Sequence, residues 1–112
     1  MPMPDANTAK IAALNDRARQ RLDHCRWILT QGVLSCDPIT VAELLIAVED
    51  FDNFTADNDP YAEHDFGVIK LSGDTFFWKF DYYDVGLQMH SPDPTDRNVT
   101  SRVLTIMLAD EY

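Results

Sequence analysis

Apolar residues recur at spacings of three and four along the N-terminal part of the chain, which is the pattern of an amphipathic helix. The first predicted helix covers about residues 8–25, with Asn7 or Thr8 as its N-terminal cap. Its apolar stripe consists of Ile11, Leu14, Ala18, Leu22 and Cys25. Residues 1–7 contain two prolines and lie ahead of this pattern, so we expect a disordered lead-in there.

A second amphipathic pattern predicts a helix over about residues 41–51. Thr40 and Glu43 have the spacing of a capping box at its start. Between the two helices, residues 27–34 are rich in β-forming side chains, and Gly32 interrupts them. This combination predicts a short strand with a turn or bulge.

Two β-rich runs, residues 64–71 and 75–83, are joined by a link of three residues, 72–74, that contains glycine. Such a link predicts a hairpin. Alternate residues of a strand share one face, and we expect the aromatic face of the second run to be the core side of the sheet. That face carries Phe76, Trp78, Phe80 and Tyr82. Residues 85–89 are expected to form a third strand.

The C-terminal segment, residues 100–110, fits two patterns. Val103, Ile106, Met107 and Asp110 lie on one helical stripe, whereas Leu104, Ile106 and Leu108 alternate as in a strand. Its Leu, Met and Ala content, with Thr100 as a cap, favours a helix. The order of elements then predicts an α+β fold, with a small, mainly antiparallel sheet of three to four strands packed against two or three helices. We expect a single domain over residues 8–112.

Composition limits the partners of this domain. The chain has 112 residues, of which 46% are hydrophobic, and a formal net charge of −10. Residues 1–36 carry a net charge of +2 and residues 37–112 carry −12, and the stretch 37–66 holds nine acids and no Lys or Arg. Nucleic-acid backbones and anionic membranes repel such a surface, so we expect neither as a direct ligand.

Targeting signals and cysteines suggest the compartment. No run approaches the roughly 20 apolar residues of a membrane span, and the first ten residues lack the apolar stretch of a signal peptide. Cys25 and Cys36 lie too far apart for a Cys-x-x-Cys motif, and we interpret them as reduced, partly buried thiols. These features predict a cytoplasmic protein.

Acidic residues are the main candidates for binding. They are Asp50, Asp52, Asp57, Asp59, Glu63 and Asp65 in one stretch, with Asp81 and Asp84 at the end of the aromatic-rich run. Dense carboxylates can bind Ca²⁺ or Mg²⁺, but Ala62 stands where an EF-hand loop counted from Asp57 needs glycine. We therefore expect no metal, no cofactor and no catalytic residue, and interpret the acids as a partner-binding surface.

His64 lies between Glu63 and Asp65, just before a predicted strand. A flanking carboxylate would hold the imidazole ring for acid–base chemistry. The alternative is a structural histidine that caps or bridges the loop. The residues alone leave both interpretations open.

The phrases FDNFTADNDPYAEHDFG, WKFDYYD, SPDP and RVLTIMLADEY occur in this order along the chain. Together they resemble an uncharacterised bacterial family, known as a domain of unknown function, that is seen chiefly in alphaproteobacterial genomes, plasmids and other mobile elements. The resemblance runs roughly from Leu14 to Tyr112. It implies a small cytoplasmic protein of mobile DNA, a setting in which small acidic proteins often block host defences.

Charge and resemblance together predict a non-enzymatic inhibitor that docks on a basic, nucleic-acid-binding surface of a host defence complex, of the anti-CRISPR or anti-restriction type. Carboxylates at a density comparable to that of duplex DNA would make it a DNA mimic. One alternative is a small enzyme or divalent-metal-binding protein that uses Glu63, His64 and Asp65. Another is an assembly subunit, such as a homodimer, that pairs through an exposed strand edge. Fold and family do not decide among these.

Overall fold

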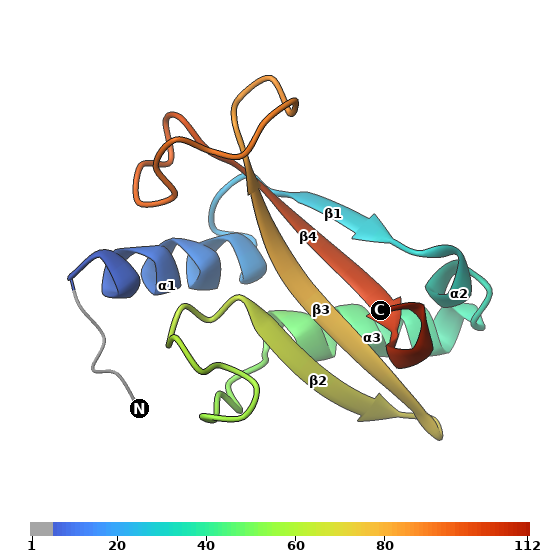
Figure 1. Cartoon of the computed structure of the whole chain (residues 1–112). Coiled ribbons are helices and arrows are strands. Elements are labelled where there is room, and N and C mark those ends of the chain that lie inside the picture. The colour runs from blue at the N-terminus through green and yellow to red at the C-terminus, as the bar shows by residue number, and fades with distance from the viewer. Residues whose placement is uncertain (1–5) are drawn as a thin grey trace.

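A four-stranded sheet with the order β1-β4-β3-β2 runs through the molecule (Figure 1). The computed structural model describes residues 6–112. The strands are β1 (Arg26–Leu29), β2 (Phe66–Leu71), β3 (Asp74–Tyr83) and β4 (Ser101–Leu108). The helices are α1 (Ala6–Arg19), α2 (Gln31–Leu34) and α3 (Pro38–Glu49), and a 3-10 turn, η1 (Ala109–Glu111), follows β4. Because only the β1–β4 pair is parallel, the predicted α+β class with a mainly antiparallel sheet is confirmed.

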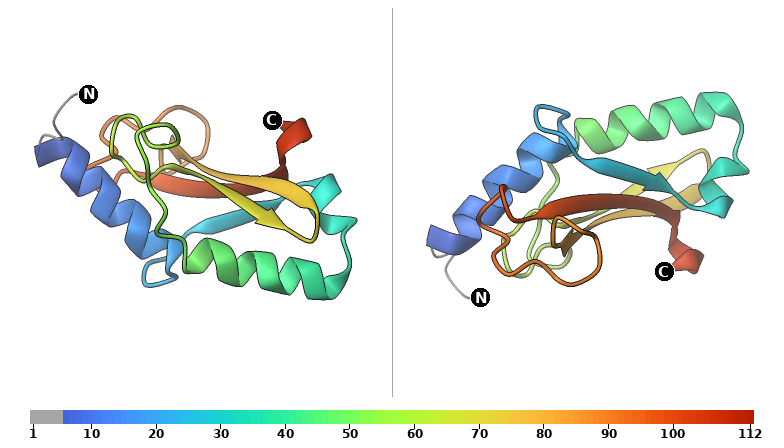
Figure 2. Two further views of the ribbon diagram at one scale, coloured as in Figure 1. Left: turned by 90° about the horizontal axis from the view of Figure 1, so that it is seen from below. Right: turned by 90° about the horizontal axis from the view of Figure 1, so that it is seen from above.

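Helices α1 and α3 lie on the same face of the sheet (Figure 2). The core consists of Ala18, Val33, Leu44, Val48, Phe76, Trp78, Phe80, Leu104 and Ile106. The predicted aromatic core face of β3 is confirmed, since Phe76 and Trp78 are fully buried and Phe80 nearly so. Full burial of such a side chain stabilises the fold by about 1.5–3 kcal/mol relative to leaving it in water. This stripe therefore fixes which face of the sheet meets the helices.

The predicted hairpin is confirmed, with a tighter turn than expected. Asp74 belongs to β3 and pairs with Leu71, so Ser72 and Gly73 alone connect the strands. Both have positive φ, 54° and 83°, as a type I′ turn requires. The residues that precede the turn in β2 and follow it in β3 therefore keep a fixed register.

The C-terminal segment is a strand, so the helix predicted over residues 100–110 is wrong. β4 lies inside the sheet, between β1 and β3. Its buried side chains are Arg102, Val103, Leu104, Ile106 and Met107. These buried side chains alternate between the two faces of the strand, so the apolar residues of β4 run together instead of alternating with exposed polar ones. Such a run has no period that separates it from a buried helix.

The third strand predicted over residues 85–89 is also wrong. The chain forms a turn there, in which the Asp84 carboxylate accepts a hydrogen bond from the backbone N–H of Gln88 at 3.0 Å. An isolated bridge between Tyr83 and His90 closes the turn. The long connection between β3 and β4 is therefore a loop that packs over one end of the sheet.

The first helix ends at Arg19, whereas the sequence pattern predicted an end near residue 25. Arg21 has a φ of 61°, which is a left-handed conformation. Its backbone N–H donates to Ala18 O at 3.2 Å, and that of Leu22 donates to Arg17 O at 2.8 Å. This pair of bonds is a Schellman motif, in which glycine usually takes the left-handed position. An arginine at this position hid the helix end from the sequence pattern.

The lead-in predicted over residues 1–7 falls mainly on residues 1–5, which lie outside the described residues. Ala6 and Asn7 differ from the prediction, because they already belong to the first turn of α1. The predicted single domain over residues 8–112 remains a prediction.

Asp37, and not Thr40, caps α3. Its carboxylate accepts hydrogen bonds from the backbone N–H of Thr40 at 2.9 Å and from Thr40 Oγ1 at 2.8 Å. Pro38 occupies the first helical position, where the missing N–H costs nothing. The helix therefore covers Pro38–Glu49 instead of residues 41–51, and the predicted capping box of Thr40 and Glu43 is wrong.

The short strand expected within residues 27–34 is present as β1. The turn expected next to it is the short helix α2.

Candidate functional site

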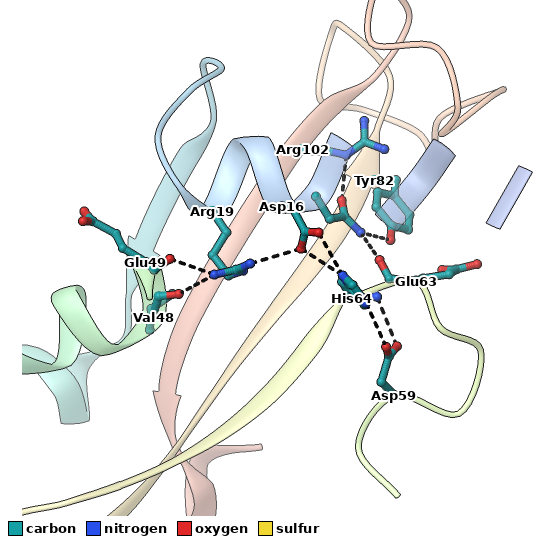
Figure 3. A network of polar contacts seen from close by, with 10 residues as sticks. Asp16, Arg19, Val48, Glu49, Asp59, Glu63, His64, Tyr82 and Arg102 are labelled. Carbon is teal, nitrogen blue, oxygen red and sulfur yellow. Dashed lines mark hydrogen bonds and ion pairs between the residues drawn. The ribbon is translucent and has the colours of Figure 1, made fainter. Parts of the chain in front are cut away.

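Residues 50–65, between α3 and β2, form a loop that we call the acidic loop. His64 bridges the acidic loop to helix α1 (Figure 3). Its Nδ1 lies 2.9 Å from Asp16 Oδ1, and its Nε2 lies 3.7 Å from Asp59 Oδ2. The imidazole ring stacks on Phe54 with 3.9 Å between ring centroids and an angle of 5° between the planes. The neighbours in sequence, Glu63 and Asp65, are not the carboxylates that hold the ring. The geometry fits the bridging interpretation of His64.

Asp59 is a buried hydrogen-bond acceptor within the acidic loop. Its side chain is only 5% exposed, and its Oδ1 accepts a hydrogen bond from the backbone N–H of His64 at 3.1 Å. The chain between them turns through positive φ at Ala62 (57°) and His64 (55°). Such conformations cost energy for residues with a side chain and persist where surrounding contacts fix them. The stacking and the Asp16 contact are those contacts.

Arg19 joins α1 to the end of α3. The side chain is 2% exposed, and its Nη1 donates to the carbonyl oxygens of Val48 at 3.1 Å and Glu49 at 2.8 Å. These carbonyls belong to the last turn of α3, where positive charge is favoured, and Val48 O also accepts a hydrogen bond from the backbone N–H of Phe51 at 3.3 Å. Arg19 Nη2 also donates to Asp16 Oδ1 at 3.0 Å. One carboxylate thus links both helices to His64.

Asn15 is fully buried beside this cluster. Its Nδ2 donates to Glu63 O and to the Tyr82 hydroxyl, both at 2.9 Å, and its Oδ1 accepts from Arg102 Nε at 2.7 Å. The Arg102 guanidinium lies 5.2 Å from the centre of the Tyr82 ring. Helix α1, the acidic loop and the two central strands therefore meet at one amide.

Sequence reasoning missed Asn15, Asp16, Arg19 and Arg102. Asn15 and Arg19 are buried, although they are polar residues of an otherwise ordinary amphipathic helix. A buried polar side chain needs hydrogen-bond partners, and here they lie 48 or more positions away for Asn15. The only signal in the sequence is the spacing of four between Asn15 and Arg19, which places both on one face of α1.

The structure brings together four of the predicted acids. Burial raises the pKa of Asp65, and the negative charges of Asp59 and Asp81 raise it further. Burial also raises the pKa of Glu63, and Asp65 and Asp59 add to the effect. Asp81 forms an ion pair with Lys79. This group is therefore partly buried, and Lys79 compensates part of its negative charge. Its members are Asp59, Glu63, Asp65 and Asp81.

The other four predicted acids lie elsewhere. Asp50, Asp52 and Asp57 are exposed, the first at the end of α3 and the other two in the loop that follows it. None of the three forms an ion pair with a described residue. Asp84 holds the turn after β3 and is half-buried. The solvated acidic surface is smaller than the sequence pattern suggested, and it lies on the outside of the loop.

Local hydrogen bonds give the acidic loop a defined shape. The backbone N–H of Thr55 donates to Asn58 Oδ1 at 3.0 Å, and Asn58 Nδ2 donates to Asn53 O at 3.1 Å. Phe54 packs edge-on against Phe51, with 5.0 Å between ring centroids. The loop is thus anchored by an aromatic side chain at its start and by His64 at its end.

Among residues 6–112, no group of three or more His, Cys, Asp or Glu side chains is arranged to hold a metal ion. Cys25 and Cys36 are free thiols, and burial raises the pKa of Cys25 to about 11, which keeps it protonated at neutral pH. None of the described helices has the length and apolar composition to span a membrane.

The structure is a small α+β fold in which helix α1 contacts the acidic loop through Asn15 and Asp16. The chain belongs to the family described as Protein of unknown function (DUF3768), which matches residues 29–111. Membership of such a family, expected from the sequence phrases, is thereby confirmed, whereas an origin in mobile elements stays a prediction. Comparison with curated proteins and with solved structures finds no match. Helix α1, with Asn15, Asp16 and Arg19, precedes the matched residues.

Proposed function

We propose that this protein is a non-enzymatic interaction module whose acidic loop docks onto a basic surface of a partner protein. The observation that carries the proposal is the contrast within the loop. Asp52 and Asp57 are exposed and have no ion-pair partner among the described residues, while the loop beneath them is fixed by His64 and Asp16. Because the backbone that carries these carboxylates is already held in place, the loop loses little conformational entropy on binding. Complementary charge also speeds the encounter with a basic partner.

We place the partner among nucleic-acid-binding proteins of host defence, such as CRISPR or restriction effectors. Their channels collect Lys and Arg to neutralise phosphates, so they offer the surface that an array of carboxylates requires. The protein would act there as an inhibitor, because it would occupy the channel in place of the nucleic acid. The net charge of −12 over residues 37–112 supports this choice.

Affinity capture from a host lysate at two salt concentrations tests the proposal. The bait is the full chain, compared with a variant in which Asp52→Lys and Asp57→Lys reverse two charges of the loop. The matched control is Asp74→Lys with Asp110→Lys, which makes the same change in net charge at two exposed acids in the β2–β3 hairpin and in η1. Lysates are treated with nuclease so that nucleic acid does not bridge bait and prey.

We expect the chain and the control variant to recover the same basic nucleic-acid-binding protein at about 50 mM salt and to lose most of it at about 500 mM. The loop variant should recover at least about tenfold less at low salt, because two charge pairs are replaced by repulsion. Equal recovery by the loop variant would contradict the proposal. Recovery that does not depend on salt would do so as well.

A small enzyme or cation-binding protein is the second candidate. It is favoured by the raised pKa values of Glu63 and Asp65, since carboxylates with raised pKa values gather at functional sites. Calorimetry with Mg²⁺, Ca²⁺, Mn²⁺ and Zn²⁺ tests it. A stoichiometric heat that is lost with Glu63→Gln and Asp65→Asn, and kept with Asp74→Asn and Asp110→Asn, would establish this candidate.

A further inference from the structure

At one end of the molecule α1 ends, β1 and β4 begin, and the loop between β3 and β4 folds over (Figure 1). Residues of these segments line a cleft of about 480 Å³. Three arginines line it, namely Arg26, Arg97 and Arg102. The chain has only nine Lys and Arg residues in total. A third of the basic side chains of a strongly acidic protein therefore face one cavity.

Arg102 is the buried member of the three. It is 7% exposed, and its position is fixed because Nε donates to Asn15 Oδ1, Nη2 donates to Pro94 O, and the guanidinium lies over the Tyr82 ring. Its Nη1 has no hydrogen-bond partner among residues 6–112. A fixed guanidinium with an unused donor at a cavity wall is suited to bind an oxyanion, since its donors match the oxygens of a carboxylate or phosphate.

Arg97 and Arg26 extend the positive side of the cleft. Arg97 is 63% exposed and is 3.4 Å from both oxygens of Asp23, the one acidic side chain that lines the cleft. Asp23 has its shorter contact with Arg17, at 2.9 Å. The Arg97 contact is long, so an incoming anion can replace it. Arg26 forms no ion pair with a described residue.

Part of the cleft lining is apolar. Leu14 from α1 and Val85 and Leu87 from the loop after β3 contribute to its lining. Val85 and Leu87 are exposed, although they are large hydrophobic side chains. A cavity with apolar walls and a few converging polar groups is the usual form of a small-molecule site.

We propose that this cleft binds a small organic oxyanion, a phosphate monoester or a carboxylate, with its charged group at Arg97 and Arg102 and its apolar body against Leu14, Val85 and Leu87. This site is separate from the acidic loop and does not depend on the function proposed above. The ligand would be negatively charged, in contrast to the positively charged partner expected at the loop.

Nuclear magnetic resonance titration of the full chain tests the site. The probes are inorganic phosphate, phenyl phosphate and phenylacetate, and the signals are the Nε–Hε resonances of the arginines and the amides of residues 97–102. Phenyl phosphate against inorganic phosphate measures the apolar wall. Phenyl phosphate against phenylacetate distinguishes a phosphate from a carboxylate ligand. Saturable shifts confined to the cleft, with at least about fivefold tighter binding of a phenyl-bearing probe than of inorganic phosphate, are expected.

Variants then assign the binding to the named residues. Arg97→Gln should weaken binding about tenfold, the size expected for one lost charge-assisted contact. Lys70→Gln is the matched control, because it removes one exposed positive charge on β2, outside the cleft, and should change nothing. Asp23→Asn should tighten binding, because it removes the competing carboxylate. The proposal is overturned if no probe gives saturable shifts below about 20 mM, or if Arg97→Gln and Lys70→Gln bind alike.

Discussion

Replacing Asn15 with alanine removes three side-chain hydrogen bonds at a fully buried position. The bond from Arg102 is charge-assisted and contributes about 1.5–3 kcal/mol, and the bonds to Glu63 O and the Tyr82 hydroxyl contribute about 0.5–1.5 kcal/mol each. Bonds that share one side chain do not add fully. We therefore expect Asn15→Ala to lower the free energy of unfolding by about 3–4 kcal/mol. This is a large part of the roughly 5–15 kcal/mol that stabilises a typical domain.

Urea denaturation followed by tryptophan fluorescence measures this loss, since Trp78 lies in the core. Asn7→Ala is the control, because Asn7 is an exposed asparagine on the same helix and its removal should change the free energy of unfolding by less than about 0.5 kcal/mol. A loss below about 1 kcal/mol in Asn15→Ala would refute the reasoning. It would mean that water replaces the lost bonds and that the contact between α1 and the loop is not cooperative.

Three further predictions concern single residues. Gly67→Ala should destabilise the fold by about 2–3 kcal/mol in the same assay, because a Cβ there would lie 2.3 Å from Trp78 Nε1. Gly86→Ala should be neutral, because its Cβ would meet only Asp84 Oδ1, at an ordinary van der Waals distance of 3.7 Å. Asp65→Asn should be more stable than the unchanged chain at pH 7 and equal to it at pH 3. Burial raises the folded-state pKa of Asp65, so its stabilising effect is present below the unfolded pKa and is lost as pH rises through the folded value. An advantage that grows toward pH 3 would contradict this sign. His64→Ala should increase amide hydrogen exchange at residues 59–64 while leaving β3 and β4 protected, and uniform exchange would contradict a local anchor.

The hairpin and the aromatic core face of the sheet could be predicted because their signals are local. Alternation over β3 places Phe76, Trp78 and Phe80 on one side, and Gly73 marks the turn. The central strand β4 could not be predicted in the same way. Its buried residues between Arg102 and Met107 face both sides of the sheet, so the period that would identify a strand is absent.

The acidic loop was recognised as a candidate site, but its internal contacts could not be predicted. Asp16 lies 48 positions before His64, and nothing in the sequence pairs them. Asp57 and Asp59 lie in the same acidic stretch and cannot be told apart by composition. Asp59 is nevertheless buried and accepts a hydrogen bond from the backbone N–H of His64, whereas Asp57 is exposed. Whether a carboxylate supports the loop or faces a partner depends on the tertiary fold, which sequence spacing does not show.

The claim that the acidic loop occupies a nucleic-acid-binding surface is tested most directly by a competition assay, in which this protein and DNA compete for the captured partner protein. The measurement is the apparent Kd of this protein for the partner at increasing concentrations of a short DNA duplex, with the Asp74→Lys, Asp110→Lys variant as control. The account predicts mutually exclusive binding, so that the apparent Kd rises in proportion to the duplex concentration for both proteins. A ternary complex, in which DNA saturates the partner and the apparent Kd stays constant, would contradict the account.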